Sequence, residues 1–367
     1  MTAVFVEMDA VKAWFPNKSY PEPPIPSAKD WLANMSVMHV WCLSMSSMFV
    51  FITFALACVH LYFVMKYVSN ERIRNDLYSL ILMYPITNFC SVMGMFIPRA
   101  AVFLYAVALV YFMFTLFVLV TVLFNIFGGR QEMSTYLLQR NVKIKLTMVP
   151  LCLCKCIPMI ESTNANLRRI EWLVFQTPVI RTCLELTSVA VSMEQGGRRE
   201  SIWFVFSQLC GLISMCVAFY GCYVMVPLGR EKHDPYQFIW LFRICDVAQC
   251  LYTIQKFVFE FAAAVGIIAS DRFLPGTSKA LWWTSFMITW QMMLLSALTS
   301  YLMRPMKCKF FDLYPTNDRP QNHPRMLRND DGSAGNSTET LQSSRSEGSA
   351  PKTSSAEMVI HGNFDSF

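Results

Sequence analysis

The sequence predicts an all-α integral membrane protein with seven transmembrane helices, its N-terminus outside and its C-terminus in the cytoplasm. Two observations carry the prediction of a membrane protein. Of the 367 residues, 54% are apolar and only 15% are charged, which is little charge for the surface of a soluble protein. The apolar residues also form uninterrupted runs, each near the roughly 20 residues that a helix needs to cross a hydrocarbon layer of about 30 Å.

Seven apolar runs define the predicted helices and divide the chain into three parts. The segment 1–38 precedes the runs and lacks the apolar core and cleavage site of a secretory signal peptide. The predicted transmembrane domain covers 39–310, and the Ser-rich segment 311–367 is expected to be a disordered cytoplasmic tail. The runs themselves cover 39–66, 77–98, 100–127, 172–193, 201–227, 238–268 and 280–303.

The distribution of lysine and arginine predicts the orientation. With the N-terminus outside, the loops that fall in the cytoplasm carry more of these residues than the outer loops do, as the positive-inside rule requires. The longest of these cytoplasmic loops is 128–171. The same orientation makes Asn17, in Asn17-Lys18-Ser19, a candidate glycosylation site.

Ionisable side chains inside the runs are the candidate binding residues. Such groups cost about 2.5–3.5 kcal/mol each in the bilayer centre, so they normally face other helices or water. Arg181 and Glu185 lie four residues apart in the fourth run and therefore share one helix face. In the sixth run, Arg243, Asp246 and Gln249 follow one face in the same way. The first two residues can form an internal ion pair, and the other three can make a polar strip along an inward face of the bundle.

The sixth run also contains Lys256 and Glu260, four residues apart. This pair is assigned the plainer role of a self-neutralising contact that holds helices together or reaches the interface. The same alternative applies to the other charged pairs.

The sequence shows no recognisable catalytic or metal-binding motif. The five histidines do not join cysteines at a zinc-like spacing, and no nucleophile, base and orienting residue form a local motif. We therefore expect a protein that is not an enzyme, has no cofactor and does not bind nucleic acid.

Three cysteines stand at alternate positions in the cytoplasmic loop, in the stretch Pro150-Leu-Cys-Leu-Cys-Lys-Cys-Ile-Pro158. A structural zinc site needs four ligands, usually in paired C-x-x-C spacing, and a redox role fits a reducing compartment poorly. S-acylation fits better because it takes place on juxtamembrane cytoplasmic cysteines. Unmodified packing residues are the other interpretation. The lipidation candidates are Cys152, Cys154, Cys156 and, just past the last run, Cys308.

An ordered set of short motifs resembles the alpha subunit of the organic solute transporter family. Ile97-Pro98-Arg99 opens the third run, Phe127-Gly128-Gly129-Arg130 closes it, and the cysteine stretch follows. Leu167-Arg168-Arg169 then leads into Phe175-Gln176, with Arg181 five positions further on. No single motif is specific, but their order and spacing agree from about residue 39 to residue 310.

The resemblance implies facilitated diffusion of amphipathic organic anions, such as steroid conjugates or bile-acid-like solutes, across the plasma membrane or an internal membrane. Arg181 or Arg243 would then meet the anionic group at the boundary between helices and lipid, and Gln176 joins the candidate binding residues. The implied partners are membrane lipids, a single-pass beta-type subunit, or other copies in a homo- or hetero-oligomer. This chain departs from the better-known members in its interrupted cysteines and its longer Ser-rich tail.

Two other functions share the predicted topology. A seven-helix receptor is disfavoured because the third run ends in Asn125-Ile-Phe-Gly-Gly, without an Asp-Arg-Tyr-like triplet, and the seventh run lacks Asn-Pro-x-x-Tyr. A membrane-organising or trafficking protein that recruits partners through its tail is the main alternative to a transporter.

Overall fold

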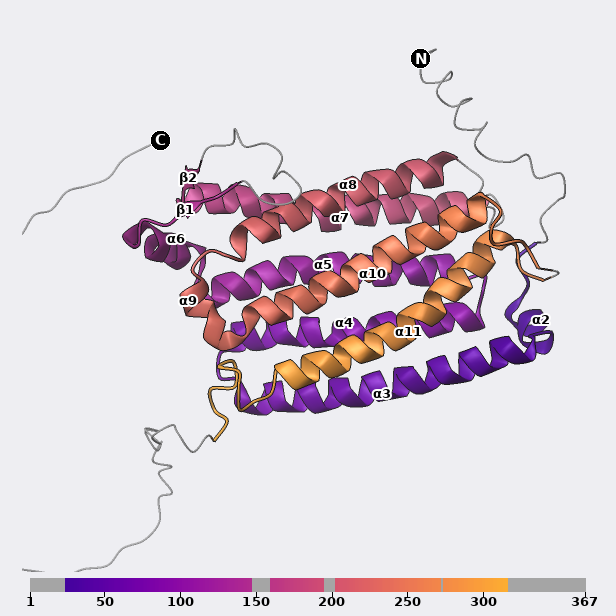
Figure 1. Cartoon of the computed structure of the whole chain (residues 1–367), viewed down its shortest axis with the longest axis horizontal. Helices are drawn as coiled ribbons and strands as arrows, with labels where there is room; N and C mark the ends of the chain where they lie inside the picture. The colour runs from indigo at the N-terminus through magenta and orange to yellow at the C-terminus, as the bar shows by residue number, and fades with distance from the viewer. Residues whose placement is uncertain (1–23, 147–158, 195–201, 272, 316–367) are drawn as a thin grey trace, which may run out of the picture. The chain divides into compact units, whose positions relative to one another are not determined.

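The computed structural model describes residues 24–146, 159–194, 202–271 and 273–315, and these residues are predominantly helical. Seven of the described helices have 24 or more residues: α3 (Val37–Tyr67), α4 (Glu71–Phe96), α5 (Ala101–Phe127), α7 (Asn164–Glu194), α8 (Ile202–Met225), α10 (Phe238–Ala264) and α11 (Gly276–Leu302). The shorter elements are α2 (Ala28–Ala33), α6 (Arg130–Gln139), α9 (Arg230–His233), the 3-10 helix η2 (Asp234–Tyr236), and the strands β1 (Lys143–Ile144) and β2 (Ile160–Glu161). Figure 1 shows their arrangement.

Each of the seven predicted apolar runs coincides with one long helix, which confirms the all-α fold class. By length and composition, four of the described helices can cross a membrane: α3, α4, α5 and the part of α8 from Phe206 to Met225. The helices α7, α10 and α11 have the length but are interrupted by more polar side chains. Seven membrane crossings and the positions of the termini stay predictions.

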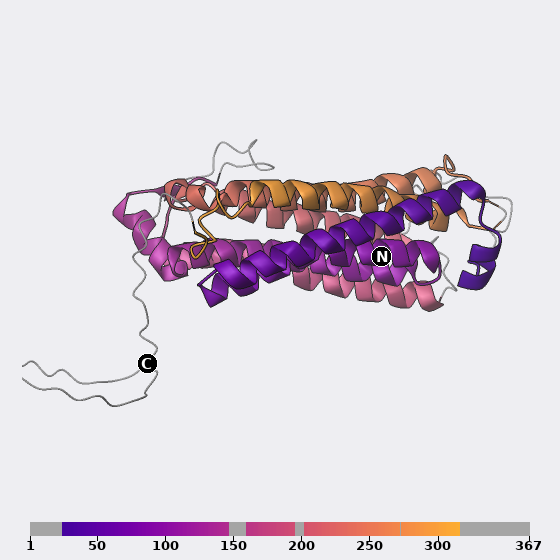
Figure 2. The same cartoon turned by 90° about the horizontal axis from the view of Figure 1, so that it is seen from below.

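The long helices lie side by side along a common direction, as the two perpendicular views show (Figures 1 and 2). Helix α4 packs against α3, α5 and α11, and α11 also packs against α3 and α10. On the other side of α4, α5 packs against α7, which pairs closely with α8. Helix α5 therefore lies between the α3–α4–α11 group and the α7–α8 pair, and it also contacts α10.

Glycine and proline mark the ends and irregularities of these helices. Helix α5 ends where Gly128 and Gly129 adopt φ values of 97° and 142°, a region that side chains with a Cβ atom rarely enter. Pro85 lies inside α4 and Pro178 inside α7, and each lacks the N–H group that would bond to the preceding turn. The Gly-Gly helix stop was expected from the sequence.

Side-chain amides connect neighbouring helices. The Nδ2 atom of Asn88 in α4 donates to Oγ1 of Thr53 in α3 at 2.8 Å, and Nδ2 of Asn125 in α5 donates to Oδ2 of Asp76 in α4 at 2.6 Å. Polar groups inside a membrane bundle need such partners because lipid tails offer none.

The residues after α11 pack back onto two earlier turns. The backbone N–H of Ser69, between α3 and α4, donates to Oδ1 of Asp312 at 3.0 Å. The thiol of Cys308 donates to the carbonyl oxygen of Tyr236 at 3.1 Å, and Cys308 is buried. This segment therefore joins the α3–α4 turn to the start of α10.

Strands β1 and β2 pair in antiparallel fashion, with Lys143 opposite Glu161 and Ile144 opposite Ile160. Three of the four lipidation candidates fall between these strands, in residues 147–158, outside the described residues. The glycosylation candidate Asn17 and the predicted tail from residue 316 also lie outside them.

Candidate functional site

The buried face of α7 is polar in the second half of the helix, from Thr177 to Ser192. Its members are three or four residues apart, which places them in one row on a helix. They are Thr177, Arg181, Glu185, Ser188 and Ser192. The opposite face carries exposed apolar side chains such as Val179 and Leu186. Helix α7 thus has the reverse polarity of a helix from a water-soluble protein, as expected for contact with lipid.

Helix α8 faces this polar row. At one point, Oγ1 of Thr177 donates to the carbonyl oxygen of Ser214 at 2.9 Å. About three turns along α7, the hydroxyl groups of Ser188 and Ser207 lie 3.1 Å apart. The side chain of Arg181 lies between these two contacts, against Gly211 of α8.

Arg181 is 1% exposed, and its nearest counter-ion is Glu185. Its Nη1 atom lies 3.7 Å from Oε1 of Glu185, too far for a normal hydrogen bond. None of the three guanidinium nitrogens has a hydrogen-bond partner within the described ranges. The five N–H donors of a guanidinium group are costly to leave unused in a buried site. The N–H groups of Arg181 are therefore available to bind an anion.

A second buried cation lies beside α5. The rings of Tyr105 in α5 and Tyr252 in α10 stack with their centroids 4.5 Å apart. One turn after Tyr252, Nζ of Lys256 lies 4.0 Å from the centroid of the Tyr105 ring and 3.8 Å from Oε1 of Glu260. A cation over an aromatic ring face is stabilised by the quadrupole of the ring.

The two cations share the same neighbourhood. Tyr105 lies close enough to Arg181 to interact with it electrostatically, and Tyr252 interacts in the same way with Glu185. Helices α5, α7 and α10 therefore bring two ion pairs and two tyrosines together in the interior of the protein. We call the set Tyr105, Arg181, Glu185, Tyr252, Lys256 and Glu260 the buried polar cluster.

Asp246 and Gln249 point to other partners. The hydroxyl group of Tyr223 in α8 donates to Oδ2 of Asp246 at 2.5 Å, and Nε2 of Gln249 donates to the carbonyl oxygen of Phe112 in α5 at 2.8 Å. Asp246 also lies ten residues from Lys256, or roughly 15 Å along α10. The structure therefore places Asp246 in a separate contact between α8 and α10.

Two further predicted residues stand apart from the buried polar cluster. Arg243 is exposed on α10, and Gln176 is half-buried on α7. Five residues separate Gln176 from Arg181, which turns its side chain about 140° away around the helix.

The structure shows the ion pair that the sequence predicted between Lys256 and Glu260. The sequence prediction did not name Gly211, Tyr105 or Tyr252. A signal existed for each kind of residue. A glycine in an apolar membrane helix often marks a close approach of two helices. A buried tyrosine requires a partner for its hydroxyl group. Neither signal identifies the partner.

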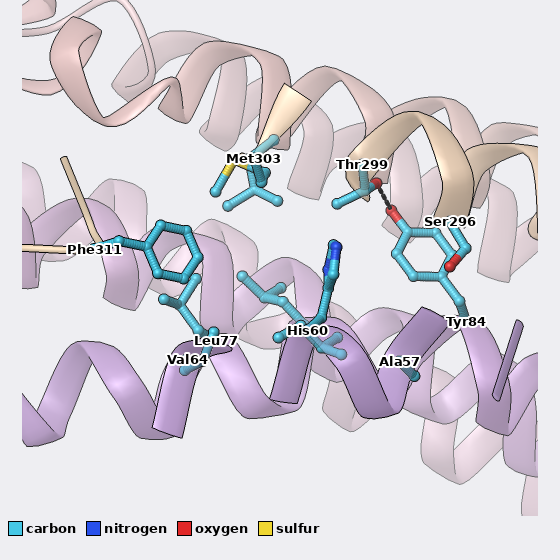
Figure 3. A pocket seen from close by; sticks show the side chains of 12 residues that line it. Ala57, His60, Val64, Leu77, Tyr84, Ser296, Thr299, Met303 and Phe311 are labelled. Atoms are coloured by element: carbon cyan, nitrogen blue, oxygen red, sulfur yellow. Dashed lines mark hydrogen bonds between the residues drawn. The ribbon is translucent and has the colours of Figure 1, made fainter. Parts of the chain in front are cut away.

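Two cavities between the helices are much smaller than a steroid site. The larger, of about 30 Å³, lies between α3, α4, α10 and α11 and is lined mainly by apolar side chains. Figure 3 shows His60 pointing into it from α3, next to the 2.8 Å hydrogen bond between Tyr84 and Thr299. The other has about 10 Å³. Sites for drug-sized ligands have about 300–1,000 Å³, and neither cavity is lined by the buried polar cluster.

The described residues contain no group of three or more His, Cys, Asp or Glu side chains placed to hold a metal ion.

Long helices with apolar outer faces and an ionisable cluster inside define a multi-pass membrane protein. The chain belongs to the organic solute transporter Ostalpha family, because a model of that family matches residues 42–307. This assignment confirms the family resemblance and supports a membrane solute transporter.

Three relatives from Caenorhabditis elegans agree with this assignment. The chain is 73% identical to organic solute transporter alpha-like protein 1 over 314 residues, covering 85% of this chain and 82% of that protein. It is 31% identical to alpha-like protein 3 over 293 residues (79% and 84% of the two chains) and 24% identical to alpha-like protein 2 over 295 residues (80% and 86%). No solved structure matches this chain.

Proposed function

We propose that this protein transports amphipathic organic anions, such as steroid conjugates or bile-acid-like solutes, by facilitated diffusion, and that Arg181 binds their anionic group. The observation that carries this proposal is that Arg181 is 1% exposed and has unused hydrogen-bond donors within the described structure. The chain that contains it belongs to a family of solute transporters. A guanidinium group binds sulfate and carboxylate groups through paired N–H donors.

The position of Arg181 defines what transport requires. Arg181 lies in the seam between α7 and α8, away from the boundary with lipid where the sequence suggested that substrate would meet it. The two small cavities do not provide a route to Arg181. We therefore expect substrate to reach Arg181 when helices separate, with α7 and α8 parting from each other or from α5 during each transport cycle.

Uptake into proteoliposomes tests the role of Arg181. Wild-type protein and the variants Arg181→Gln and Arg181→Lys are reconstituted in equal amounts, and uptake of a radiolabelled steroid sulfate is measured. Arg181→Gln should lower uptake at least about tenfold, because a charge-assisted hydrogen bond contributes about 1.5–3 kcal/mol. Arg181→Lys should retain part of the uptake because it keeps the charge but loses the paired donors.

Arg140→Gln is the matched control. Arg140 is exposed at the end of α6 and pairs with the exposed Glu231. Neither residue belongs to the buried polar cluster. This variant should transport like the wild type. Uptake by Arg181→Gln at the wild-type rate, with equal protein and unchanged thermal stability, would refute the proposal.

The partner and the membrane are part of the proposal. We propose a plasma-membrane protein with seven spans that works with a single-pass beta-type subunit, on the basis of the family. Reconstitution with and without such a subunit tests this requirement. If no uptake is seen under either condition, the trafficking function becomes the better explanation.

The proposal also includes S-acylation of Cys152, Cys154 and Cys156 and glycosylation of Asn17. The paired strands at Ile144 and Ile160 bring the two ends of the cysteine segment together. Acyl chains would hold this loop against the membrane. Acyl exchange that is sensitive to hydroxylamine should disappear when the three cysteines are replaced by serine, and persistence of the full signal would rule these sites out.

A further inference from the structure

Gly211 in α8 lies where a side chain would collide with the guanidinium group of Arg181. A Cβ atom at this position would lie 2.1 Å from Nη1, 2.3 Å from Cζ and 2.8 Å from Nε. Contacts below about 3 Å are not tolerated, so Arg181 can keep this position only opposite a glycine. Close approach, and not an unusual backbone conformation, explains the glycine, since Gly211 lies within regular helix.

The glycine acts on the end of a flexible side chain. All three atoms that a new Cβ would meet belong to the guanidinium group, which can turn away without moving the α7 backbone. Few polar contacts hold the guanidinium group, since Glu185 is 3.7 Å away and the three nitrogens have no hydrogen-bond partner in the described residues. The space left by the missing side chain of Gly211 therefore largely determines where the guanidinium group of Arg181 lies.

We propose that Gly211 is a positioning residue for oxyanion recognition: it admits the guanidinium group into the α7–α8 seam, where paired N–H donors meet two oxygens of a sulfate or carboxylate. This inference rests on the proposed role of Arg181 in transport. Its ligand class is an oxyanion with two accessible oxygens, which matches the planar fork of a guanidinium group.

Gly221 provides a matched control on the same helix. A Cβ atom there would lie 2.9 Å from Cγ2 of Val174 and 3.3 Å from the carbonyl oxygen of Ile170, both in α7. Gly221→Ala therefore crowds the same seam without touching Arg181. A purely structural role for Gly211 predicts that both glycine variants behave alike.

The test is steroid sulfate uptake by Gly211→Ala and Gly221→Ala, each in the wild-type and the Arg181→Gln background. We expect Gly211→Ala to raise KM about tenfold or more with a smaller change in the maximal rate, because the guanidinium group is displaced from the oxyanion. In the Arg181→Gln background, the same substitution should change the residual uptake less than about twofold. Gly221→Ala should lower thermal stability without a selective change in KM.

The outcomes separate this inference from the function on which it rests. If Arg181→Gln leaves uptake unchanged, the proposed function fails. If Arg181→Gln lowers uptake but Gly211→Ala leaves KM unchanged, or acts equally strongly in both backgrounds, the positioning role alone is refuted.

A folding failure is also informative. If Gly211→Ala does not fold because its Cβ meets the guanidinium group, combining it with Arg181→Gln should restore a monodisperse protein. If the combined variant also fails to fold, Gly211 is needed for helix packing itself and the inference is wrong.

Discussion

Tyr105 and Tyr252 exchange hydrogen bonds across two helices: the hydroxyl group of each donates to the backbone carbonyl oxygen of the other, at 3.2 Å in both directions. The reciprocal bonds fix α5 and α10 at the depth where Lys256 lies over the Tyr105 ring. A buried hydroxyl group without a partner is costly in a bilayer, so the pair also satisfies two groups that lipid could not.

Removing either hydroxyl group should destabilise the protein modestly. Tyr105→Phe and Tyr252→Phe each lose one buried bond while keeping the stacked rings, and each should cost about 1 kcal/mol. Thermal unfolding in detergent measures the loss. Tyr301→Phe is the control, because Tyr301 is exposed near the end of α11. Equal melting temperatures for all variants would show that the reciprocal bonds do not contribute to stability.

The ion pair between Lys256 and Glu260 should respond unequally to loss of its two members. Lys256 is 2% exposed in its side chain and Glu260 is 20% exposed. Glu260→Gln takes a carboxylate away from a deeply buried cation and should cost about 3 kcal/mol, whereas Lys256→Met leaves a carboxylate that is less deeply buried and should cost less. Removing both should cost less than Glu260→Gln alone.

The measurement for this pair is thermal unfolding of the two single variants and the double variant. A double variant that is less stable than Glu260→Gln would contradict the argument, because it would mean that Lys256 stabilises the fold even without the carboxylate. Uptake measured on the same samples tells whether Lys256 also contributes to the proposed anion site.

His233 should make stability fall in mild acid. It is buried at the end of α9, its Nε2 atom donates to the carbonyl oxygen of Val226 at 2.9 Å, and burial lowers the pKa of its imidazole. The folded protein thus binds this proton less readily than the unfolded chain, in which histidine titrates near about pH 6.5. The contribution is complete above that pH and is lost as pH falls below it.

The test compares melting temperatures of wild-type protein and His233→Gln from pH 7.5 down to about pH 5. Glutamine keeps a donor for the Val226 carbonyl oxygen but does not titrate. The loss due to His233 should be up to about 1.4 kcal/mol per pH unit between the unfolded and folded pKa values, and this part should be missing from His233→Gln. Identical pH profiles would show that another group is responsible.

Cys308 should resist modification in the folded protein. It is buried, its thiol donates to the carbonyl oxygen of Tyr236, and burial raises the pKa of the thiol to about 12. At pH 8 only about one thiol in ten thousand would be the reactive thiolate. Iodoacetamide followed by peptide mass mapping should label Cys308 slowly before denaturation and completely afterwards.

The same geometry bears on acylation at Cys308, which was predicted because the residue follows the last apolar run. An acyltransferase would first have to release the segment that packs Cys308 against Tyr236. Rapid labelling of Cys308 in the native protein would show that this segment opens readily and would keep Cys308 among the acylation sites.

Hydropathy predicted the long helices well but not their polar ends. Helix α7 begins at Asn164, although its apolar run begins at residue 172. The intervening Leu167-Arg168-Arg169 continues the helix without being apolar. The sequence pattern finds the part of a helix that suits lipid, whereas the backbone hydrogen bonds continue as long as the residues tolerate them.

The sequence by itself determined which residues form long helices and that Arg181 and Glu185 share a face, because length, hydropathy and the helical period are local properties. Only the tertiary structure decided that Arg181 meets Gly211, that Lys256 joins Tyr105, and that Arg243 stays exposed. The physical reason is that lipid is as apolar as leucine, so burial does not select one neighbour over another. Close packing and hydrogen bonds between particular helices make that selection, and they depend on rotation and depth that no single run encodes.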